Sequence, residues 1–222
     1  MMLPTSKHMP LHILDNKLWF PPASDADNEG LLAMGGDLSV DRLLIAYKNG
    51  IFPWFDGEIP LWWCPDPRFV LLPSELIVSK SMQSLLKKRS FQFTTNKAFR
   101  EVIAHCKKVK RREQDGTWIT DSVEKAYIEL HELGFAHSAE VWQDGKLMGG
   151  LYGIKMGKVF FGESMFSLTS NASKYAFITF VAQLKEEGIE IIDCQIYTEH
   201  LESLGAKMME RDLFINTIHQ LI

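Results

Sequence analysis

The sequence predicts an α+β protein, and three features of its pattern lead to that class. Residues 96–134 carry apolar side chains at the spacing of amphipathic helices. Residues 136–165 have the pattern of three strands joined by tight turns, and a helix followed by one more strand occupies 171–194. Helices followed by neighbouring strands favour a mixed, largely antiparallel sheet with helices packed on it.

The N-terminal third is rich in turns and contains one expected helix. Ser39 can cap this helix and Gly50 can end it, because serine accepts hydrogen bonds from free N–H groups and glycine adopts a left-handed conformation readily. A two-proline loop at residues 64–67 marks a domain boundary. We therefore expect a small N-terminal α/β domain over residues 1–68 and a second domain over 69–222.

Three further helices are expected in the middle of the chain. The first spans Ser79–Lys88, Asn96 caps the second, and Thr120 caps the third, which ends at Gly134. The inward-facing positions of the last two are Phe99, Val102, Ile103 and Cys106, and then Val123, Tyr127 and Leu130.

The strands follow as a meander. Ala136–Trp142, Leu147–Ile154 and Val159–Met165 are separated by turns at Asp144-Gly145 and Met156-Gly157, which favour antiparallel pairing.

A helix from Ser170 or Asn171 to Glu187 and a strand over Glu190–Cys194 complete the domain. Meander, helix and strand in this order form the core of the acetyltransferase superfamily, so we expect an acetyltransferase-like second domain. Those enzymes usually hold coenzyme A with a Q/R-x-x-G-x-G/A turn at a helix N-terminus. No glycine here has Gln or Arg three positions before it, which implies another acyl donor.

Composition narrows the class of function. A net charge of −4 argues against a general nucleic-acid binder, although two basic runs, Lys87-Lys88-Arg89 and residues 107–112, could contact phosphates. Such runs are more often simply solvated surface. No apolar run is long enough for a membrane helix and no secretory signal is visible, so we expect no membrane association. Three cysteines without a CxxC pair favour reduced thiols in the cytoplasm.

Several common catalytic sites are excluded by inspection. The chain has no GxxxxGK loop for ATP and no GxSxG nucleophile turn. The stretch His131–Phe135 lacks the second histidine of a zinc HExxH helix, so no metal is expected.

The polar residues that remain cluster at two strand ends. Glu163 ends one strand, and Asp193 and Gln195 alternate with Cys194 in another, so that the first two share a face. A carboxylate beside an amide suits proton handling and carbonyl chemistry. The alternative is a polar strand end whose groups are satisfied by nearby backbone.

Ten short motifs resemble one known family, leucyl/phenylalanyl-tRNA–protein transferase, over about residues 15–215. They occur in order as GLLAMGGDLS (30–39), Tyr47 with GIFPW (50–54), WWCPDPR (62–68), TWIT (117–120), AHSAEVW (136–142), GGLYG (149–153), GESMFS (162–167), NASK (171–174), IDCQ (192–195) and SLGA (203–206).

The resemblance implies a bacterial cytoplasmic enzyme that is expected to be a monomer. It would move Leu, and also Phe or Met, from aminoacyl-tRNA to proteins that begin with Arg or Lys. The new N-terminus would mark these proteins for N-degron proteolysis. The resemblance also implies that neither ATP, coenzyme A nor a metal takes part.

The resemblance further assigns roles to residues. Asp193 would accept or orient the proton of the attacking amine, Gln195 would relay hydrogen bonds, and Glu163 would lie near the acceptor's cationic side chain or the terminal adenosine. The tRNA phosphates would meet Lys87, Lys88 and Arg89. The substrate-binding positions that match the family are Trp54, Trp118, Leu151, Phe160, Gly162, Ser167, Phe177, Phe180 and Ile192.

Three positions depart from the resemblance. Leu151 stands where methionine is usual, Phe177 where leucine is usual, and Thr198 where asparagine is usual. The phenylalanine would narrow the slot for the donated side chain. Two other functions compete: a related N-acyltransferase that uses a different donor, and a tRNA-binding or degron-binding module without catalysis, which would not need Asp193.

Overall fold

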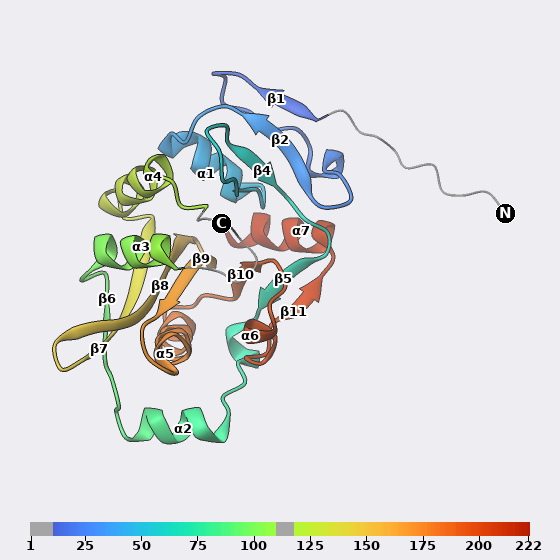
Figure 1. Ribbon diagram of the computed structural model, residues 1–222. Coiled ribbons are helices and arrows are strands. Elements are labelled where there is room, and N and C mark those ends of the chain that lie inside the picture. The colour runs from blue at the N-terminus through green and yellow to red at the C-terminus, as the bar shows by residue number, and fades with distance from the viewer. Residues whose placement is uncertain (1–10, 110–117) are drawn as a thin grey trace.

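The structure, a computed structural model, describes residues 11–109 and 118–222. The described chain forms two sheets, a four-stranded sheet of order β1-β2-β4-β3 and a seven-stranded sheet of order β11-β5-β10-β9-β8-β7-β6. Figure 1 shows the smaller sheet at the top of the molecule and the larger sheet below it, with helices on both sides.

The N-terminal sheet pairs β1 parallel with β2, and its other pairings are antiparallel. Its one α-helix, α1, follows Ser39 as expected, although the Ser39 side chain makes no capping hydrogen bond. The elements of this part are β1 (His12–Leu14), the 3-10 helix η1 (Ala23–Asp25), β2 (Leu31–Gly35), α1 (Val40–Lys48), β3 (Phe52–Pro53) and β4 (Leu61–Trp63).

The larger sheet contains the predicted meander, β7-β8-β9, and confirms its antiparallel pairing. Strand β10 pairs parallel with β9, while the remaining pairings described for this sheet are antiparallel. Its strands are β5 (Arg68–Leu71), β6 (Gln92–Thr95), β7 (Ala136–Gln143), β8 (Lys146–Met156), β9 (Val159–Ser167), β10 (Ile191–Gln195) and β11 (Lys207–Met209).

The helices around this sheet are η2, a 3-10 helix (Pro73–Glu75), α2 (Lys80–Lys87), α3 (Phe99–Lys108), α4 (Asp121–Glu132), α5 (Ala172–Glu186), α6 (Glu199–Glu202) and α7 (Arg211–Leu221). Four of them, α2, α3, α4 and α5, lie close to the predicted spans, whereas η2, α6 and α7 were not predicted.

The predicted cap is confirmed at Thr120 and wrong at Asn96. The side chain of Thr120 accepts a hydrogen bond from the first turn of α4, and Ser79, which was predicted only as the start of a helix, caps α2 in the same way. Helix α3, however, begins after Ala98, not Asn96. Asn96 has a φ of 57°, and its side-chain oxygen accepts the backbone N–H of Ser138 at 2.9 Å. Its local hydrogen-bonding capacity is therefore used to join the loop to β7.

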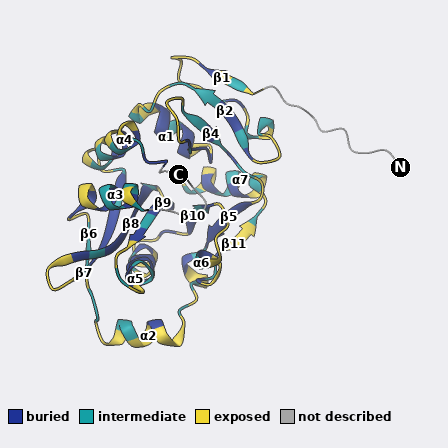
Figure 2. Cartoon of the chain, viewed as in Figure 1, coloured by how far each residue is buried: buried dark blue, intermediate teal, exposed yellow. Residues whose placement is uncertain are grey.

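Side-chain alternation along the strands divides the core into two clusters, one on each face of the large sheet. Leu151 and Phe160 belong to the cluster under α2 and α5, whereas Tyr152 and Phe161 belong to the cluster under α1, α3 and α4. Figure 2 shows buried residues concentrated between these layers and exposed residues on the outer faces of the helices.

The second cluster extends into the N-terminal sheet, so the two parts share one apolar core. The Tyr47 ring of α1 lies 5.1 Å from the Phe161 ring of β9. Phe214 of α7 is fully buried in the same cluster. The domain boundary predicted after residue 68 falls inside β5 and stays a prediction. Within the described residues, no helix has both the length and the apolar character needed to cross a bilayer.

Candidate active site

A cavity of about 620 Å³ lies where the two parts of the molecule meet. Its wall is mainly apolar, and polar groups gather at the middle of β9 and in the second half of β10. The predicted site residues that line it are Trp54, Trp118, Leu151, Phe160, Gly162, Phe177 and Ile192, together with Glu163, Asp193 and Gln195. Glu163 lies at the centre of β9, so the expectation that it ends a strand is wrong, because β9 continues to Ser167.

The polar end of the cavity forms where β9 and β10 stop pairing. Their parallel ladder runs as far as Phe161 opposite Asp193. A register shift against β8 then leaves Glu163 without a partner residue, and a shift against β5 does the same for Cys194. Such bulges redirect side chains near active sites. They also interrupt the strict alternation predicted for residues 193–195, and Cys194 lines the same cavity as its neighbours.

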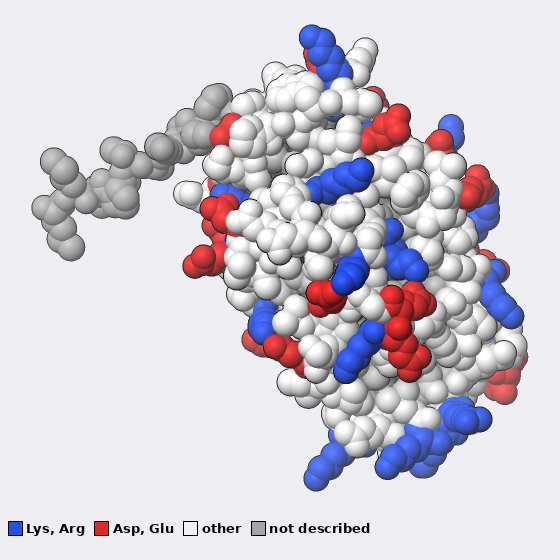
Figure 3. Space-filling model, turned by 180° about the vertical axis from the view of Figure 1, so that it is seen from behind, with Lys and Arg blue, Asp and Glu red and all other residues white. Residues whose placement is uncertain are grey.

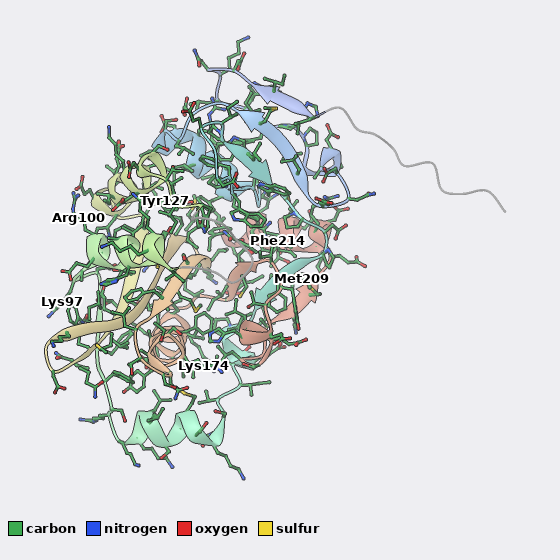
Figure 4. All side chains as sticks on the ribbon, viewed as in Figure 1. Lys97, Arg100, Tyr127, Lys174, Met209 and Phe214 are labelled. Carbon is green, nitrogen blue, oxygen red and sulfur yellow. The ribbon has the colours of Figure 1, made fainter. Side chains whose placement is uncertain are left out.

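Glu163 is surrounded by hydrogen-bond donors from three other elements. Its Oε1 accepts hydrogen bonds from the Tyr47 hydroxyl at 2.7 Å and from Gln195 Nε2 at 2.9 Å. Its Oε2 accepts from the Tyr127 hydroxyl at 3.0 Å. The two tyrosine hydroxyls also hydrogen-bond to each other. Figure 4 labels Tyr127 on α4, above the large sheet.

Burial raises the pKa of Glu163 to about 7, because a charged carboxylate loses its hydration there. The hydrogen bonds from Tyr47, Tyr127 and Gln195 oppose this shift, and the nearby charge of Asp193 adds to it. The side chain nevertheless keeps some accessible surface, which faces the cavity. Glu163 can therefore exchange a proton near neutral pH.

Asp193, unlike Glu163, has an ion-pair partner among the described residues, because Arg68 binds both of its carboxylate oxygens. Arg68 Nε donates to Oδ1 at 2.8 Å and Nη2 donates to Oδ2 at 2.7 Å, and both side chains are essentially fully buried. Burial alone would lower the pKa of Arg68, but the charge and hydrogen bonds of Asp193 raise it above its ordinary value. Asp193 is thus held as one half of an ion pair.

Gln195 is fixed at both ends. Its backbone N–H donates to Asp193 Oδ1 at 2.9 Å, and its φ of 63° lies in the left-handed region that non-glycine residues adopt rarely. With Nε2 bound to Glu163, the amide oxygen is turned away from that carboxylate and can accept a hydrogen bond from an amine. The site therefore combines an ion-paired anchor, a rigid amide and a titratable carboxylic acid beside an apolar cavity.

Comparison with known sequences decides the family. A family model described as "Leucyl/phenylalanyl-tRNA protein transferase" matches residues 70–219, and one described as "Leucyl/phenylalanyl-tRNA protein transferase N-terminal domain" matches residues 36–66. The chain belongs to the leucyl/phenylalanyl-tRNA–protein transferase family. It is therefore an aminoacyltransferase, as the motifs predicted.

Individual members of the leucyl/phenylalanyl-tRNA–protein transferase family are similar over nearly their whole length. The protein of that name from Flavobacterium johnsoniae is 54% identical over 209 residues, which cover 94% of this chain and 99% of the relative. The one from Pseudomonas fluorescens strain Pf0-1 is 55% identical over 202 residues, with 90% of this chain and 89% of the relative covered.

Among solved structures, the crystal structure of FemX superposes with a TM-score of 0.51 at 12% identity, covering 82% of this chain and 71% of FemX. At this identity the likeness concerns the fold alone. This likeness agrees with the α+β, acetyltransferase-like fold that was predicted for the chain.

Two residues that the family resemblance assigned to substrate binding lie outside the cavity wall. The Ser167 hydroxyl is exposed, donates to the Thr169 carbonyl at 2.8 Å and accepts the Ser173 N–H at 3.2 Å, which shapes the loop before α5. Phe180 packs edge-on against Phe160 with ring centroids 5.1 Å apart, one layer behind the wall. Both assignments stay predictions.

The basic run assigned to tRNA lies at the end of α2. Lys87, Lys88 and Arg89 are exposed, and Figure 3 shows basic side chains gathered at the lower end of the molecule, where α2 lies in Figure 1. Of the second basic run, Lys107 contacts Asp121 and Glu124, and Lys110, Arg111 and Arg112 lie outside the described residues.

Three side chains that bind Glu163 or Asp193 are absent from the site residues predicted from the sequence. In the sequence, Tyr47 and Arg68 appear only as members of motifs, and Tyr127 appears only as an inward-facing helix position. A buried arginine or tyrosine hydroxyl needs a polar partner, which was the available signal. Within the described residues, no group of three or more His, Cys, Asp and Glu side chains could hold a metal ion.

Proposed function

We propose that the cavity binds the aminoacyl end of a charged tRNA and that the enzyme transfers Leu, or Phe or Met, to the N-terminal Arg or Lys of an acceptor protein. The observation that carries this proposal is the combination of an apolar cavity with a carboxylic acid and an amide at its end. The apolar cavity can hold an apolar side chain, and the carboxylic acid and the amide can bind and deprotonate an amine. N-degron marking is the biological consequence.

The apolar part of the cavity suits the donated side chain. Trp54 from the loop after β3, Trp118 from the loop before α4 and Phe177 from α5 reach it. Leu151, Phe160 and Ile192 supply its sheet side. Burying a Leu or Phe side chain in such a slot contributes about 1.5–3 kcal/mol of binding free energy. The ester carbonyl then lies toward the polar end.

The polar end suits the acceptor amine. An aminoacyl ester is already activated, so the enzyme must position the amine and stabilise the oxyanion that forms. Two roles were expected for Asp193, orienting the amine and accepting its proton. The pairing of Asp193 with Arg68 supports the first role, which Asp193 would perform by holding the Gln195 backbone in place. The Gln195 amide would then hold the amine. Glu163 is the carboxylate of the cavity wall without an ion-pair partner among the described residues, so it would face the acceptor's positive charge.

The tRNA body would lie across the α2 surface, where Lys87, Lys88 and Arg89 can contact phosphates without reading sequence. We further propose that the enzyme acts as a monomer in the cytoplasm, and that the reaction proceeds without ATP, coenzyme A or a metal.

The proposal is tested by transfer of radiolabelled Leu from charged tRNA to a peptide with N-terminal Arg. Labelled peptide is expected without added ATP or coenzyme A, and the same peptide with an acetylated N-terminus should receive no label. Absence of transfer to the free amine would refute the proposal.

The Asp193→Asn variant separates an enzyme from a binding module. It keeps the size of the side chain and removes its charge. An enzyme should lose most transfer while charged tRNA still binds. Unchanged transfer would contradict the positioning role of Asp193.

A further inference from the structure

Glu163, Tyr47 and Tyr127 form a closed ring of oxygen atoms. The Tyr47 hydroxyl contacts Glu163 Oε1, the Tyr127 hydroxyl contacts Oε2, and the two hydroxyls contact each other. The three side chains come from α1, α4 and β9, which the shared core brings together. Both tyrosines are fully buried, whereas Glu163 also lines the cavity.

A count of protons distinguishes two states of this ring. Each hydroxyl carries one proton, so an ionised Glu163 leaves two protons for three contacts. If both tyrosines donate to the carboxylate, their mutual contact has no hydrogen. A protonated Glu163 supplies the third proton, and every contact then has one donor: Oε2 to Tyr127, Tyr127 to Tyr47, and Tyr47 to Oε1. Only the protonated state gives a hydrogen to all three contacts, including the one between the two hydroxyls.

We propose that Glu163, within the ring formed by Tyr47 and Tyr127, takes the proton from the α-ammonium group of the acceptor. This role rests on the proposed function and deepens it. When Glu163 is ionised, both hydroxyls donate to its charge. When it is protonated, the ring closes. The tyrosines therefore hydrogen-bond to both forms and favour the ionised one, so that Glu163 is ready to take a proton and can release it in each cycle.

The proton balance is complete without another reactant. The α-ammonium gives one proton to Glu163, and the neutral amine attacks the ester carbonyl. A C–N bond forms, the bond from the carbonyl carbon to the ribose oxygen breaks, and the second amine proton goes to that leaving oxygen. Glu163 then releases its proton to solvent through the cavity. A free α-amine has a pKa of about 7.7–8.0, so an acceptor is mostly protonated at neutral pH.

The groups around Glu163 favour Glu163 over Asp193 as the acceptor of the ammonium proton. Asp193 of β10 contributes negative charge that raises the pKa of Glu163, and Asp193 itself is paired with Arg68 of β5. Tyr152 of β8 packs against Tyr127, with ring centroids 5.6 Å apart.

His200 of α6 lines the same cavity, and burial lowers its pKa, so it stays neutral near pH 7. Burial also raises the pKa of Glu163 to about 7, in the range that an acceptor amine requires.

The test is the pH dependence of single-turnover transfer from Leu-tRNA to one peptide with N-terminal Arg, between about pH 6 and pH 9. Tyr47→Phe and Tyr127→Phe each remove one donor to the ionised carboxylate. The acid limb of the profile should move up by about one pH unit, so the rate falls about tenfold at low pH and recovers at high pH. The same acceptor is used throughout, so its own titration cancels in the comparison.

Tyr175→Phe is the matched control, because Tyr175 is also buried but packs against Phe91, away from the cavity wall. Its profile should not move. A fall in rate of equal size at every pH in the two ring variants would mean that the ring is only structural, and would overturn the proposal.

A second readout does not depend on turnover. Infrared difference spectra of the free enzyme should show a carboxylic acid carbonyl band that titrates near neutral pH and disappears in Glu163→Gln. If this band is absent while the wild type transfers Leu, the ring proposal fails and the proposed function stands. If the band titrates but no Leu is transferred, the proposed function fails, and with it the role of the ring as a base.

Discussion

Arg68 and Asp193, 125 positions apart in the chain, form a doubly hydrogen-bonded ion pair inside the protein. The pair joins the start of β5 to the middle of β10. The guanidinium also lies 4.7 Å from the ring centre of Phe52 and 4.8 Å from that of Phe214, so it contacts both the N-terminal sheet and α7. One buried cation thus connects three parts of the structure beside the cavity.

We expect Asp193→Ala to reduce the free energy of unfolding by about 3–5 kcal/mol, because it leaves the buried Arg68 without a counter-charge. Urea unfolding followed by circular dichroism measures this loss. The double variant Arg68→Met, Asp193→Leu removes both charges and should recover most of it, since two well-packed apolar residues can replace a buried pair. A loss below about 1 kcal/mol in the single variant would show that water reaches the pair.

We expect Glu163 to make folding less favourable as pH rises through neutrality. Burial raises its pKa from 4.5 to about 7 in the folded protein, so the folded state binds a proton that the unfolded chain releases. Its contribution to stability is fully present below about pH 4.5 and is lost as pH rises through about 7, on the order of 3 kcal/mol in total.

Glu163→Gln, which stays neutral, provides the reference. The unfolding free energy of wild type relative to this variant should decrease between about pH 5 and pH 8. A difference that does not change with pH would mean that Glu163 titrates at an ordinary value in the folded state.

Local pattern predicted the fold better than it predicted the site. The meander and its first turn were correct because side-chain alternation and tight turns are encoded by neighbouring residues. The second turn lies one residue later than predicted, at Gly157-Lys158. The Asn96 cap was wrong because a contact with Ser138, distant in sequence, uses its side chain. The position of Glu163 and Cys194 at bulges could not be read from the sequence, since a bulge depends on the partner strand.

The residues that surround the site could not be predicted from local pattern either, because they meet through contacts that are distant in sequence. Tyr47 and Glu163 are 116 positions apart, and each alone is an ordinary core tyrosine or strand carboxylate. Motif resemblance placed Glu163, Asp193 and Gln195 together, and all three line the cavity. It did not give the ion pair of Asp193, because that depends on the contact with Arg68, 125 positions away.

We expect the basic run at the end of α2 to contribute to tRNA binding and not to the chemical step. Replacing Lys87, Lys88 and Arg89 with Gln should raise the KM for charged tRNA several-fold with little change in kcat, since phosphate contacts are made equally in the ground and transition states. The effect should shrink as salt increases. The exposed Lys125 and Lys146, replaced in the same way, are the control. A fall in kcat at constant KM would contradict this assignment.

We expect Phe177→Leu to increase transfer of Phe relative to Leu. Phe177 is 4% exposed and its side chain lines the cavity that we propose holds the donated residue, so its ring limits the space there. A misfit on the scale of one methylene group contributes about 1–3 kcal/mol of discrimination, which corresponds to a change of about 10- to 200-fold in the ratio of kcat/KM for Leu-tRNA and Phe-tRNA. Phe180→Leu is the matched control, because Phe180 lies one turn further along α5 and packs behind Phe160 without reaching the cavity. The control should change stability but not the ratio, because the packing that it loses lies outside the slot. A ratio that is the same in wild type and Phe177→Leu would show that Phe177 is an ordinary core residue.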